Sequence, residues 1–202
     1  KVPHALTPIE EDCPFHPASP YAISKVGADL AARFYAEAYG MNIVVTRMFT
    51  HTGPRRGDVF MESSFAKQIA MGELSGERTI QVGNLKSIRT IADVRDAVRA
   101  YYLALTVNPQ AGAVYNIGGH YTCSVSNVLQ TLFEMSNCPS SEWGYRITAE
   151  RLRPVDADNQ IPNCSKFKAA TGWEPKIKFE HTMRDLLDYW RQRVQHEAFL
   201  TR

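Results

Sequence analysis

Three features that are common in enzymes and binding proteins are missing from this sequence of 202 residues. It has no Gly-x-Gly-x-x-Gly motif, no Cys-x-x-Cys pair and no apolar run near the roughly 20 residues that cross a bilayer. Without the glycine motif, the chain lacks the usual loop that binds the phosphates of a dinucleotide. Without a long apolar run, no membrane partner is predicted. The net charge of +2 is small for a dedicated nucleic-acid binder, so no nucleic-acid partner is predicted either.

The cysteines and histidines do not suggest a metal site. The four cysteines lie at unrelated spacings, and the six histidines are scattered without a ligand-like pairing to a cysteine. We therefore predict free thiols in a reducing, cytoplasmic compartment, and no metal.

A tyrosine and a lysine stand four residues apart at the start of a predicted helix. Ser19 and Pro20 form a helix-start signal, and Tyr21 and Lys25 follow at once. Residues four apart project from the same helix face. A free phenol ionises near pH ~10, and a fixed neighbouring cation favours its ionised form. The pair therefore predicts proton exchange with a substrate hydroxyl or carbonyl. The alternative interpretation of the pair is structural: a tyrosine packed on the helix beside a solvated lysine.

Strand patterns alternate with helix patterns along the chain. A helix is predicted from Pro20 to Tyr39, with apolar residues at helical spacing: Ile23, Val26, Leu30 and Phe34. The β-branched run 43–45 predicts a strand buried on both faces. A helix is predicted from Asp93, with an inner face of Val94, Ala97, Val98, Tyr101 and Leu105. Further strands are expected at 79–82, 87–91, 114–117 and 145–148. Helices are expected at about 60–71, 125–136 and 165–171. A last helix follows, with one apolar stripe formed by Met183, Leu186, Leu187, Trp190 and Val194. This alternation indicates an α/β protein with parallel strands.

An ordered series of motifs follows the tyrosine–lysine pair. The motifs are Arg47-Met-Phe49, Gly53-Pro-Arg55, Asn84-Leu85, Ile91-Ala-Asp93-Val-Arg-Asp96, Tyr115-Asn-Ile-Gly118, Arg151-Leu-Arg-Pro154 and Thr171-Gly-Trp173-x-Pro175. With Tyr21-x-x-x-Lys25 ahead of it, the series resembles the extended short-chain dehydrogenase/reductases that modify nucleotide sugars. His51 and the run 54–60 look like GDP-mannose 4,6-dehydratases, whereas 64–69 and 93–96 look more like GDP-4-keto-6-deoxy-mannose reductases.

The resemblance implies the C-terminal part of a Rossmann-type doubly wound parallel sheet plus a small α/β substrate-binding lobe. Residues 1–50 would be the remainder of the dinucleotide-binding domain. Residues 51–202 would be mainly the nucleotide-sugar lobe, with about 79–118 returning to the sheet. The family's glycine fingerprint and the Ser/Thr-Glu segment of its dehydratases are expected ahead of Lys1. We therefore expect residues 1–202 alone to be inactive.

The resemblance also implies roles for individual residues. In such enzymes the tyrosine matching Tyr21 takes the sugar O4 proton while a hydride passes from C4 to the nicotinamide of NADP or NAD. The lysine matching Lys25 hydrogen-bonds the nicotinamide ribose. The remaining candidates would bind the nucleotide sugar, a GDP-hexose by this resemblance, and are Thr50, His51, Arg55, Asn84, Arg89 and Arg153. Thr50 stands where the family commonly has a diphosphate-binding asparagine, and its side chain is shorter and has no amide.

Three functions stay open at this point. A GDP-mannose 4,6-dehydratase activity, with C4 oxidation, loss of water across C5–C6 and re-reduction at C6, is favoured. The alternative is a 4-keto-6-deoxy-hexose 4-reductase or a sugar 4-epimerase. The third is a truncated nucleotide-sugar-binding or assembly fragment without redox chemistry. A homodimer or homotetramer is expected of the enzyme.

Overall fold

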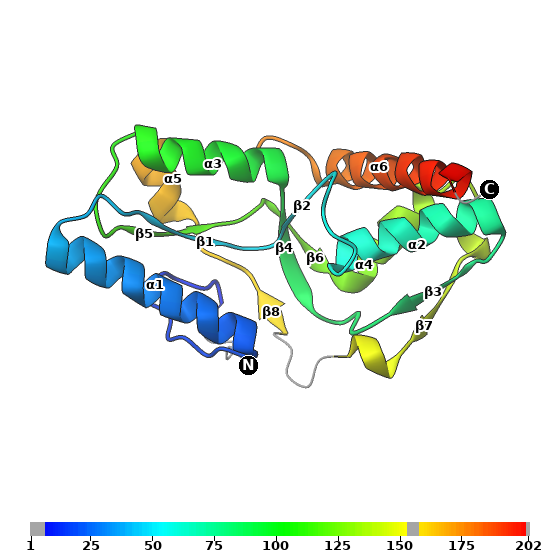
Figure 1. Ribbon diagram of the computed structural model, residues 1–202, viewed down its shortest axis with the longest axis horizontal. Helices are drawn as coiled ribbons and strands as arrows, with labels where there is room; N and C mark the ends of the chain where they lie inside the picture. Colours follow the sequence, from blue (N-terminus) through cyan, green and yellow to red (C-terminus); the bar gives the residue numbers. More distant parts are fainter. Residues whose placement is uncertain (1–6, 153–157, 201–202) are drawn as a thin grey trace. The chain divides into compact units, whose positions relative to one another are not determined.

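The structure, a computed structural model, describes residues 7–152 and 158–200 (Figure 1). The α-helices are α1 (Pro20–Tyr39), α2 (Met61–Ser75), α3 (Val94–Thr106), α4 (Val125–Glu134), α5 (Ser165–Thr171) and α6 (Phe179–Leu200). The strands are β1 (Val45–Met48), β2 (His51–Thr52), β3 (Thr79–Val82), β4 (Ile88–Asp93), β5 (Val114–Ile117), β6 (Tyr121–Ser124), β7 (Gly144–Ile147) and β8 (Asn159–Gln160). The 3-10 helices of the described residues include η2 (Ser140–Glu142) and η3 (Ala149–Arg151).

Parallel strand pairs connect segments that are far apart in the sequence. β1 pairs with β5, β3 with β7, and β4 with β8, all in parallel. A further sheet has the order β2-β4-β6, with β8 beside β4. Parallel strands need a crossover connection, which the intervening helices supply. The predicted α/β class is confirmed.

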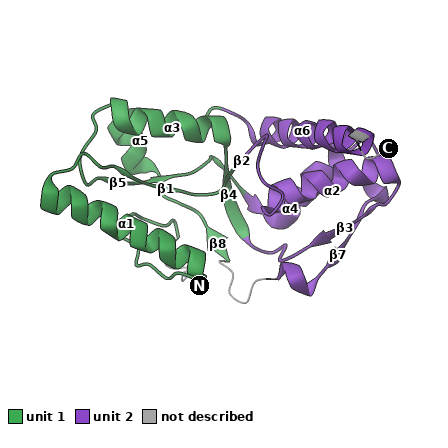
Figure 2. Ribbon diagram, viewed as in Figure 1, with its two compact units in different colours: residues 1–51, 88–122, 154–176 green, residues 52–87, 123–153, 177–202 purple. Residues whose placement is uncertain are grey.

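The chain forms two compact units, each made of three segments (Figure 2). Unit 1 contains residues 1–51, 88–122 and 154–176. Unit 2 contains residues 52–87, 123–153 and 177–202. Neither unit is continuous in sequence, so the chain passes between them several times.

Unit 1 is built around the β1–β5 pair. In Figure 1, α3 and α5 lie on one side of this pair and α1 lies on the other. The core between β5, α3 and α5 contains Ala100, Ala104, Tyr115, Ile117, Phe167 and Trp173. The carboxyl ends of β1 and β5 therefore lie at the same edge, the edge at which ligands bind in open α/β sheets.

In unit 2, α2 packs against α4, α6 and β3. The predicted apolar stripe of the last helix is confirmed, because all five of its members are buried: Met183, Leu186, Leu187, Trp190 and Val194. This stripe belongs to α6. The predicted helix at 60–71 is α2, which extends to Ser75 and stops at Gly76, whose φ is 86°. Glycine adopts this left-handed conformation at a helix end without steric cost.

An ion pair joins α2 to α6 within unit 2. Arg191 donates two hydrogen bonds to the Glu73 carboxylate, at 2.8 and 2.7 Å. The two side chains are only 17% and 8% exposed, respectively. Burial by itself would raise the pKa of Glu73, but hydrogen bonds from Arg191 and Asn137 outweigh it and hold the pKa below its usual value. The pair is therefore formed at neutral pH.

We expect Glu73→Gln to lower the free energy of unfolding at pH 7 by about 2 kcal/mol, because Arg191 loses its buried carboxylate partner and keeps only the more exposed one, Asp188, at 2.7 Å. The folded-state pKa of Glu73 is depressed. The stabilisation is therefore complete above the unfolded pKa and is lost as pH falls through the folded pKa. Urea unfolding should give wild type and Glu73→Gln different free energies of unfolding at neutral pH and similar ones below about pH 4. Glu180→Gln, an exposed glutamate of α6, is the control. A difference that does not change with pH would contradict this assignment.

Two sequence expectations about unit 1 are wrong. β1 begins at Val45, and each of its four residues is only half-buried, so it is not a strand buried on both faces. No buried face was predicted for α1, of which only Asp29 and Ala36 are buried. Along α3, the buried residues include Ala97, Ala100 and Ala104, but Val98 and Leu105, predicted to face inward, are 60% and 65% exposed. The buried side of α3 thus carries alanines, and two of its larger apolar side chains are exposed.

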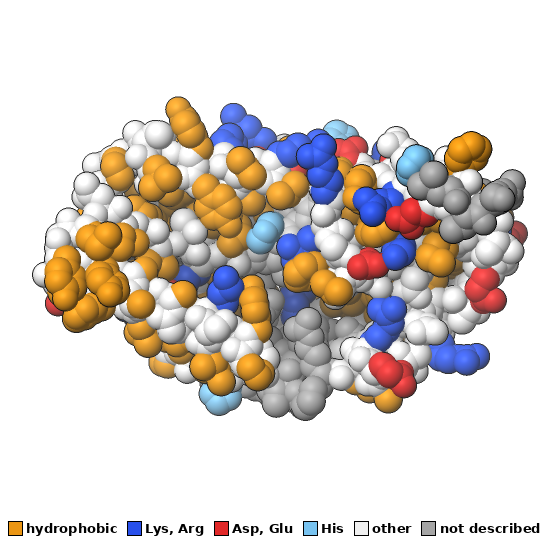
Figure 3. Space-filling model, in the orientation of Figure 1, with side chains coloured by type: hydrophobic (Ala, Val, Ile, Leu, Met, Phe, Trp, Pro, Cys, Tyr) orange, Lys and Arg blue, Asp and Glu red, His pale blue; other side chains and the backbone are white. Residues whose placement is uncertain are grey.

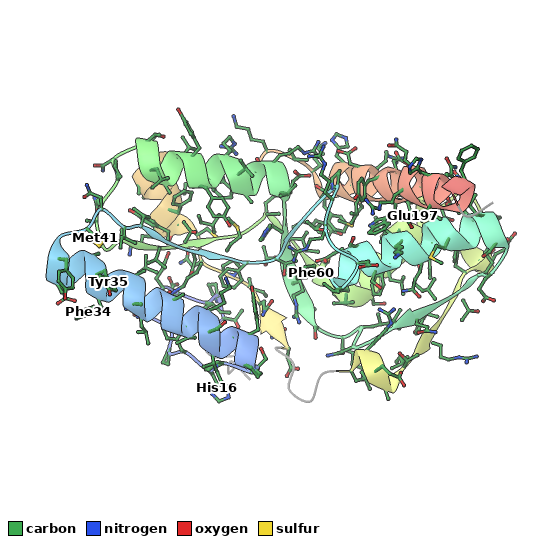
Figure 4. The ribbon with its side chains drawn as sticks, viewed as in Figure 1. His16, Phe34, Tyr35, Met41, Phe60 and Glu197 are labelled. Atoms are coloured by element: carbon green, nitrogen blue, oxygen red, sulfur yellow. The ribbon has the colours of Figure 1, made fainter. Side chains whose placement is uncertain are left out.

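The exposed apolar residues of α1 include Ile23, Leu30, Phe34, Tyr35 and Tyr39, each at least 48% exposed. Figure 3 shows hydrophobic side chains gathered over this part of unit 1. In Figure 4, Phe34, Tyr35 and Met41 lie at the C-terminal end of α1. Among the described residues, no helix is both long enough and apolar enough to cross a membrane.

Candidate functional site

The tyrosine–lysine pair lies at the start of α1, as predicted. The Ser19 hydroxyl caps the helix by accepting a hydrogen bond from the Ala22 amide at 3.1 Å. Tyr21 is 71% exposed, and the Lys25 ammonium lies 5.5 Å from the centre of its ring. The cation therefore lies over the face of the phenol. A substrate hydroxyl can reach the phenol oxygen from solvent.

The carboxyl end of β1 carries two further candidates. The backbone of Thr50 is fixed by the Ala92 amide, which donates to its carbonyl at 2.9 Å. The Nδ1 atom of His51 lies 3.1 Å from the Phe49 carbonyl, so Nδ1–H donates to it in the corresponding tautomer. Both residues are half-buried. The strand end is therefore rigid, and its backbone contacts orient the imidazole.

Arg89 and Asn84 lie in or close to β4. Arg89 is half-buried in β4, at the position paired with Gln160 of β8, and it donates to the Ile88 carbonyl at 2.9 Å. Asn84 precedes the strand in a tight turn. Its amide nitrogen donates to the Ser87 hydroxyl at 2.8 Å, and its oxygen accepts from the Lys86 amide at 3.0 Å. These contacts fix the Asn84 amide within its own turn.

The loop before α2 presents Arg55. This residue is exposed and has a φ of 72°, a left-handed conformation that side chains other than glycine adopt at some cost. The buried Ser63 hydroxyl donates to the Arg56 carbonyl at 2.6 Å and accepts from the Trp190 indole at 2.7 Å. The Arg56 guanidinium lies 3.4 Å from the centre of the Phe60 ring, and Figure 4 shows Phe60 at the start of α2. The loop is therefore anchored, and Arg55 projects from it.

The candidates divide between the units. Five belong to unit 1, namely Tyr21, Lys25, Thr50, His51 and Arg89. Arg55 and Asn84 belong to unit 2. Arg153 lies outside the described residues. Within unit 1, α1 carries the dyad, Thr50 lies between β1 and β2, His51 begins β2, and Arg89 lies in β4.

Comparison with known proteins gives the family. A family model for GDP-mannose 4,6 dehydratase matches residues 3–186 of the chain. The chain belongs to the GDP-mannose 4,6-dehydratase family. The match includes every motif quoted above.

Relatives of this family match almost the whole chain. The GDP-6-deoxy-D-mannose reductase of Pseudomonas aeruginosa is 30% identical over 198 residues, covering 98% of this chain and 64% of the reductase. GDP-mannose 4,6 dehydratase 2 of Arabidopsis thaliana is 30% identical over 194 residues, covering 96% of this chain and 51% of the plant protein. The structure of RMD from Pseudomonas aeruginosa complexed with NADPH superposes with a TM-score of 0.85 at 28% identity, covering 96% of this chain and 63% of that one. The chain thus spans between half and two thirds of these relatives.

Two residues with no predicted role tie elements of this dehydratase-family chain together. Arg47 forms an ion pair with Asp29, from β1 to α1. In unit 2, the Arg151 guanidinium donates to the Ser64 hydroxyl of α2 at 2.8 Å. Arg47 and Arg151 both stand inside family motifs, which was the only signal in the sequence. Their partners are distant in sequence, so the motifs alone do not identify these contacts.

None of the four cysteines is paired in a disulfide. The four cysteines are free thiols, as predicted. Burial raises the pKa of the Cys123 and Cys164 thiols to about 11 each, so both are protonated at neutral pH. In the part of the chain that the structure describes, no three His, Cys, Asp or Glu side chains gather into a metal-holding group.

Proposed function

We propose that the native protein modifies a nucleotide sugar, a GDP-hexose, as a GDP-mannose 4,6-dehydratase. The observation that carries this proposal is the Tyr21–Lys25 dyad, capped at the start of α1 with the ammonium 5.5 Å from the ring centre, in a chain of this family. A phenol beside a fixed cation suits proton exchange with the O4 hydroxyl of a hexose. The reaction would oxidise C4, eliminate water across C5–C6 and reduce C6.

In this proposal the residues act in three groups. Tyr21 takes the O4 proton, and Lys25 binds the nicotinamide ribose. Thr50 and His51 contact the sugar at the strand end. The nucleotide diphosphate and base would be bound by the remaining candidates, Arg55, Asn84, Arg89 and Arg153. Guanidinium groups suit phosphate because their donors match its oxygens in pairs.

NADP or NAD would be the cofactor, and when bound it supplies the acceptor and later the donor of the hydride. The exposed dyad fits the nicotinamide ribose, since its ammonium and phenol both remain open to solvent in α1. The sequence has no glycine-rich fingerprint for the pyrophosphate. Lys25 and Tyr21 are therefore the cofactor contacts that this proposal assigns within the chain.

The test is turnover by the native protein. GDP-mannose with NADP or NAD is expected to give a 4-keto-6-deoxy product that is lighter by one water, detected by mass spectrometry. Failure to convert GDP-, UDP- and dTDP-hexoses in either redox direction, with no binding of any of them by calorimetry, would refute the proposal.

A reductase is the second candidate, favoured by one observation. The first-named relative is a GDP-6-deoxy-D-mannose reductase that matches 98% of this chain. A reductase would consume a GDP-4-keto-6-deoxy-hexose with NADPH and leave GDP-mannose untouched. A 4-epimerase would invert C4 without net oxidation. A binding fragment would retain nucleotide-sugar affinity and show no turnover. Mass spectrometry identifies the dehydratase by the loss of one water from GDP-mannose, and the reductase by the gain of two hydrogens on the 4-keto sugar with NADPH. An epimer has the mass of its substrate and is identified by NMR, and a binding fragment is identified by calorimetry without turnover.

We also propose a cytoplasmic homodimer or homotetramer. The compartment is supported by the four free cysteines. Self-association is supported by the apolar side chains exposed on α1 and α3, among them Leu30 at 50% and Leu105 at 65%. Sedimentation of the native protein tests it. A monomer at micromolar concentration would contradict the assembly.

A further inference from the structure

A guanidinium on β1 holds a carboxylate in the middle of α1. The Arg47 Nε donates to one oxygen of Asp29 at 2.7 Å, and a terminal nitrogen of Arg47 donates to the other oxygen at 3.2 Å. The side chains are 18% and 8% exposed, respectively. Two parallel hydrogen bonds define both the distance and the angle between the groups. The pair therefore restrains the rotation of α1 as well as its separation from β1.

Asp29 shares a broad helix stripe with the dyad. Tyr21, Lys25 and Asp29 follow one another at intervals of four residues, and such residues project from neighbouring positions of one face. A rotation of α1 about its axis would move all three side chains together. The bond from Asp29 to Arg47 therefore restrains the direction in which the phenol and the ammonium point.

Arg47 is also close in sequence to two candidate sugar-binding residues of unit 1. It lies three residues before Thr50 and four before His51, on the strand whose carboxyl end carries both. The chain itself joins α1 to β1 only at the far end of the helix, through residues 40–44. The Asp29–Arg47 pair is a direct connection nearer to the dyad than that loop.

Arg47 is itself held on two other sides. It donates to the Glu11 carbonyl, and its guanidinium lies 4.6 Å from the centre of the Phe15 ring. The segment that holds Glu11 and Phe15 is tied to β5, because the Glu11 carboxylate accepts from the backbone N–H of Asn116 at 2.8 Å. The guanidinium therefore has little freedom to move, and its bonds to Asp29 restrain α1 relative to the sheet.

We propose that Asp29 and Arg47 are positioning residues: their ion pair fixes the orientation of the Tyr21–Lys25 dyad relative to Thr50 and His51. Their role in the reaction depends on the function proposed above, whereas their restraint on α1 does not. Arg33 offers a matched comparison. It also pairs with Asp29, at 2.9 Å, but from within α1 itself, so it does not connect the helix to the strand.

The test compares conservative variants of the native protein. Arg47→Lys keeps the charge but loses the paired hydrogen bonds, and Asp29→Glu keeps the charge on a longer arm. For each we expect kcat to fall by about 10- to 100-fold with KM within about twofold, since a displacement of about 1 Å suffices for such a loss. Amide hydrogen exchange in residues 23–29 should rise about tenfold while that of α6 is unchanged. Arg33→Gln should match wild type in every measurement.

Each outcome bears on the proposal. Wild-type exchange and kcat in both conservative variants would overturn it, and so would Arg33→Gln with losses equal to those of Arg47→Lys. If Arg47→Lys fails to fold, Asp29→Glu decides by the same measurements. If the native protein converts no nucleotide sugar, the proposed function fails, and the exchange comparison alone decides whether the pair restrains α1.

Discussion

Tyr21→Phe is expected to lower kcat of the native protein on its nucleotide sugar by about 10³-fold, with KM nearly unchanged. The phenol oxygen is the atom that exchanges the O4 proton in the proposed reaction. Phenylalanine keeps the ring beneath the Lys25 ammonium, whose 5.5 Å distance is measured to the ring centre. The substitution therefore removes the acid–base group and leaves the helix intact. Steady-state kinetics with NADP and the sugar accepted in the turnover assay measure the loss.

Tyr39→Phe is the matched control. Tyr39 is also on α1 and is 68% exposed, close to the 71% of Tyr21. It lies 18 residues further along, or about 27 Å at the rise of an α-helix. Its ring stacks on Tyr35 with centroids 5.4 Å apart, a contact that phenylalanine retains. We expect wild-type kcat for this variant. A Tyr21→Phe enzyme that keeps more than about a tenth of the activity would exclude Tyr21 as the acid–base group.

Gly119→Ala is expected to have the largest effect on stability, about 4 kcal/mol or more, or to prevent folding. A Cβ atom at Gly119 would lie 1.7 Å from the Ile91 carbonyl oxygen and 2.7 Å from the Ala92 nitrogen. Both are backbone atoms of β4, so no side chain can move aside. The Ala92 amide also donates to the Thr50 carbonyl, so displacement of β4 would disturb the strand end that carries Thr50. Thermal and urea unfolding measure the loss.

Gly27→Ala is the opposite case in the same unit. A Cβ at Gly27, in the interior of α1, meets nothing within 4 Å. Alanine should stabilise the helix there by up to about 1 kcal/mol. A Gly119→Ala protein that melts within a few degrees of wild type would show that β4 is not closely packed against Gly119. A Gly27→Ala protein that is strongly destabilised would show that α1 is covered at this position.

Local signals in the sequence predicted the helices well. Ser19 and Pro20 begin α1 and Gly40 ends it, and α5 ends at Gly172, because caps and left-handed glycines act within one turn. The stripe of α6 was also predicted, since its five apolar residues lie on one side of a polar helix. The candidate dyad was found for the same reason: both of its residues lie on one helix, four positions apart.

Apolar spacing was a poor guide to which face of a helix is buried. Phe34 on α1 and Val98 on α3 both lie at helical spacing, yet they are 57% and 60% exposed. The periodicity gives an apolar face, whereas burial depends on the distance at which the helix meets a sheet. On α3 that distance is set by alanines, which the apolar pattern did not distinguish from larger residues. A strand such as β1 is likewise buried only to the extent that neighbours cover it.

By itself, the sequence determined the alternation of helices and strands, the ends of α1 and α5, the order of motifs and the Tyr21–Lys25 dyad, since each depends on residues close together in the chain. The tertiary structure alone decided the contacts between distant segments. Examples are the Asp29–Arg47 pair, the approach of Gly119 to β4 and the division of the candidates between two units. Such contacts depend on where the chain returns in space, and parallel strand pairs bring together segments whose separation in sequence gives no local signal.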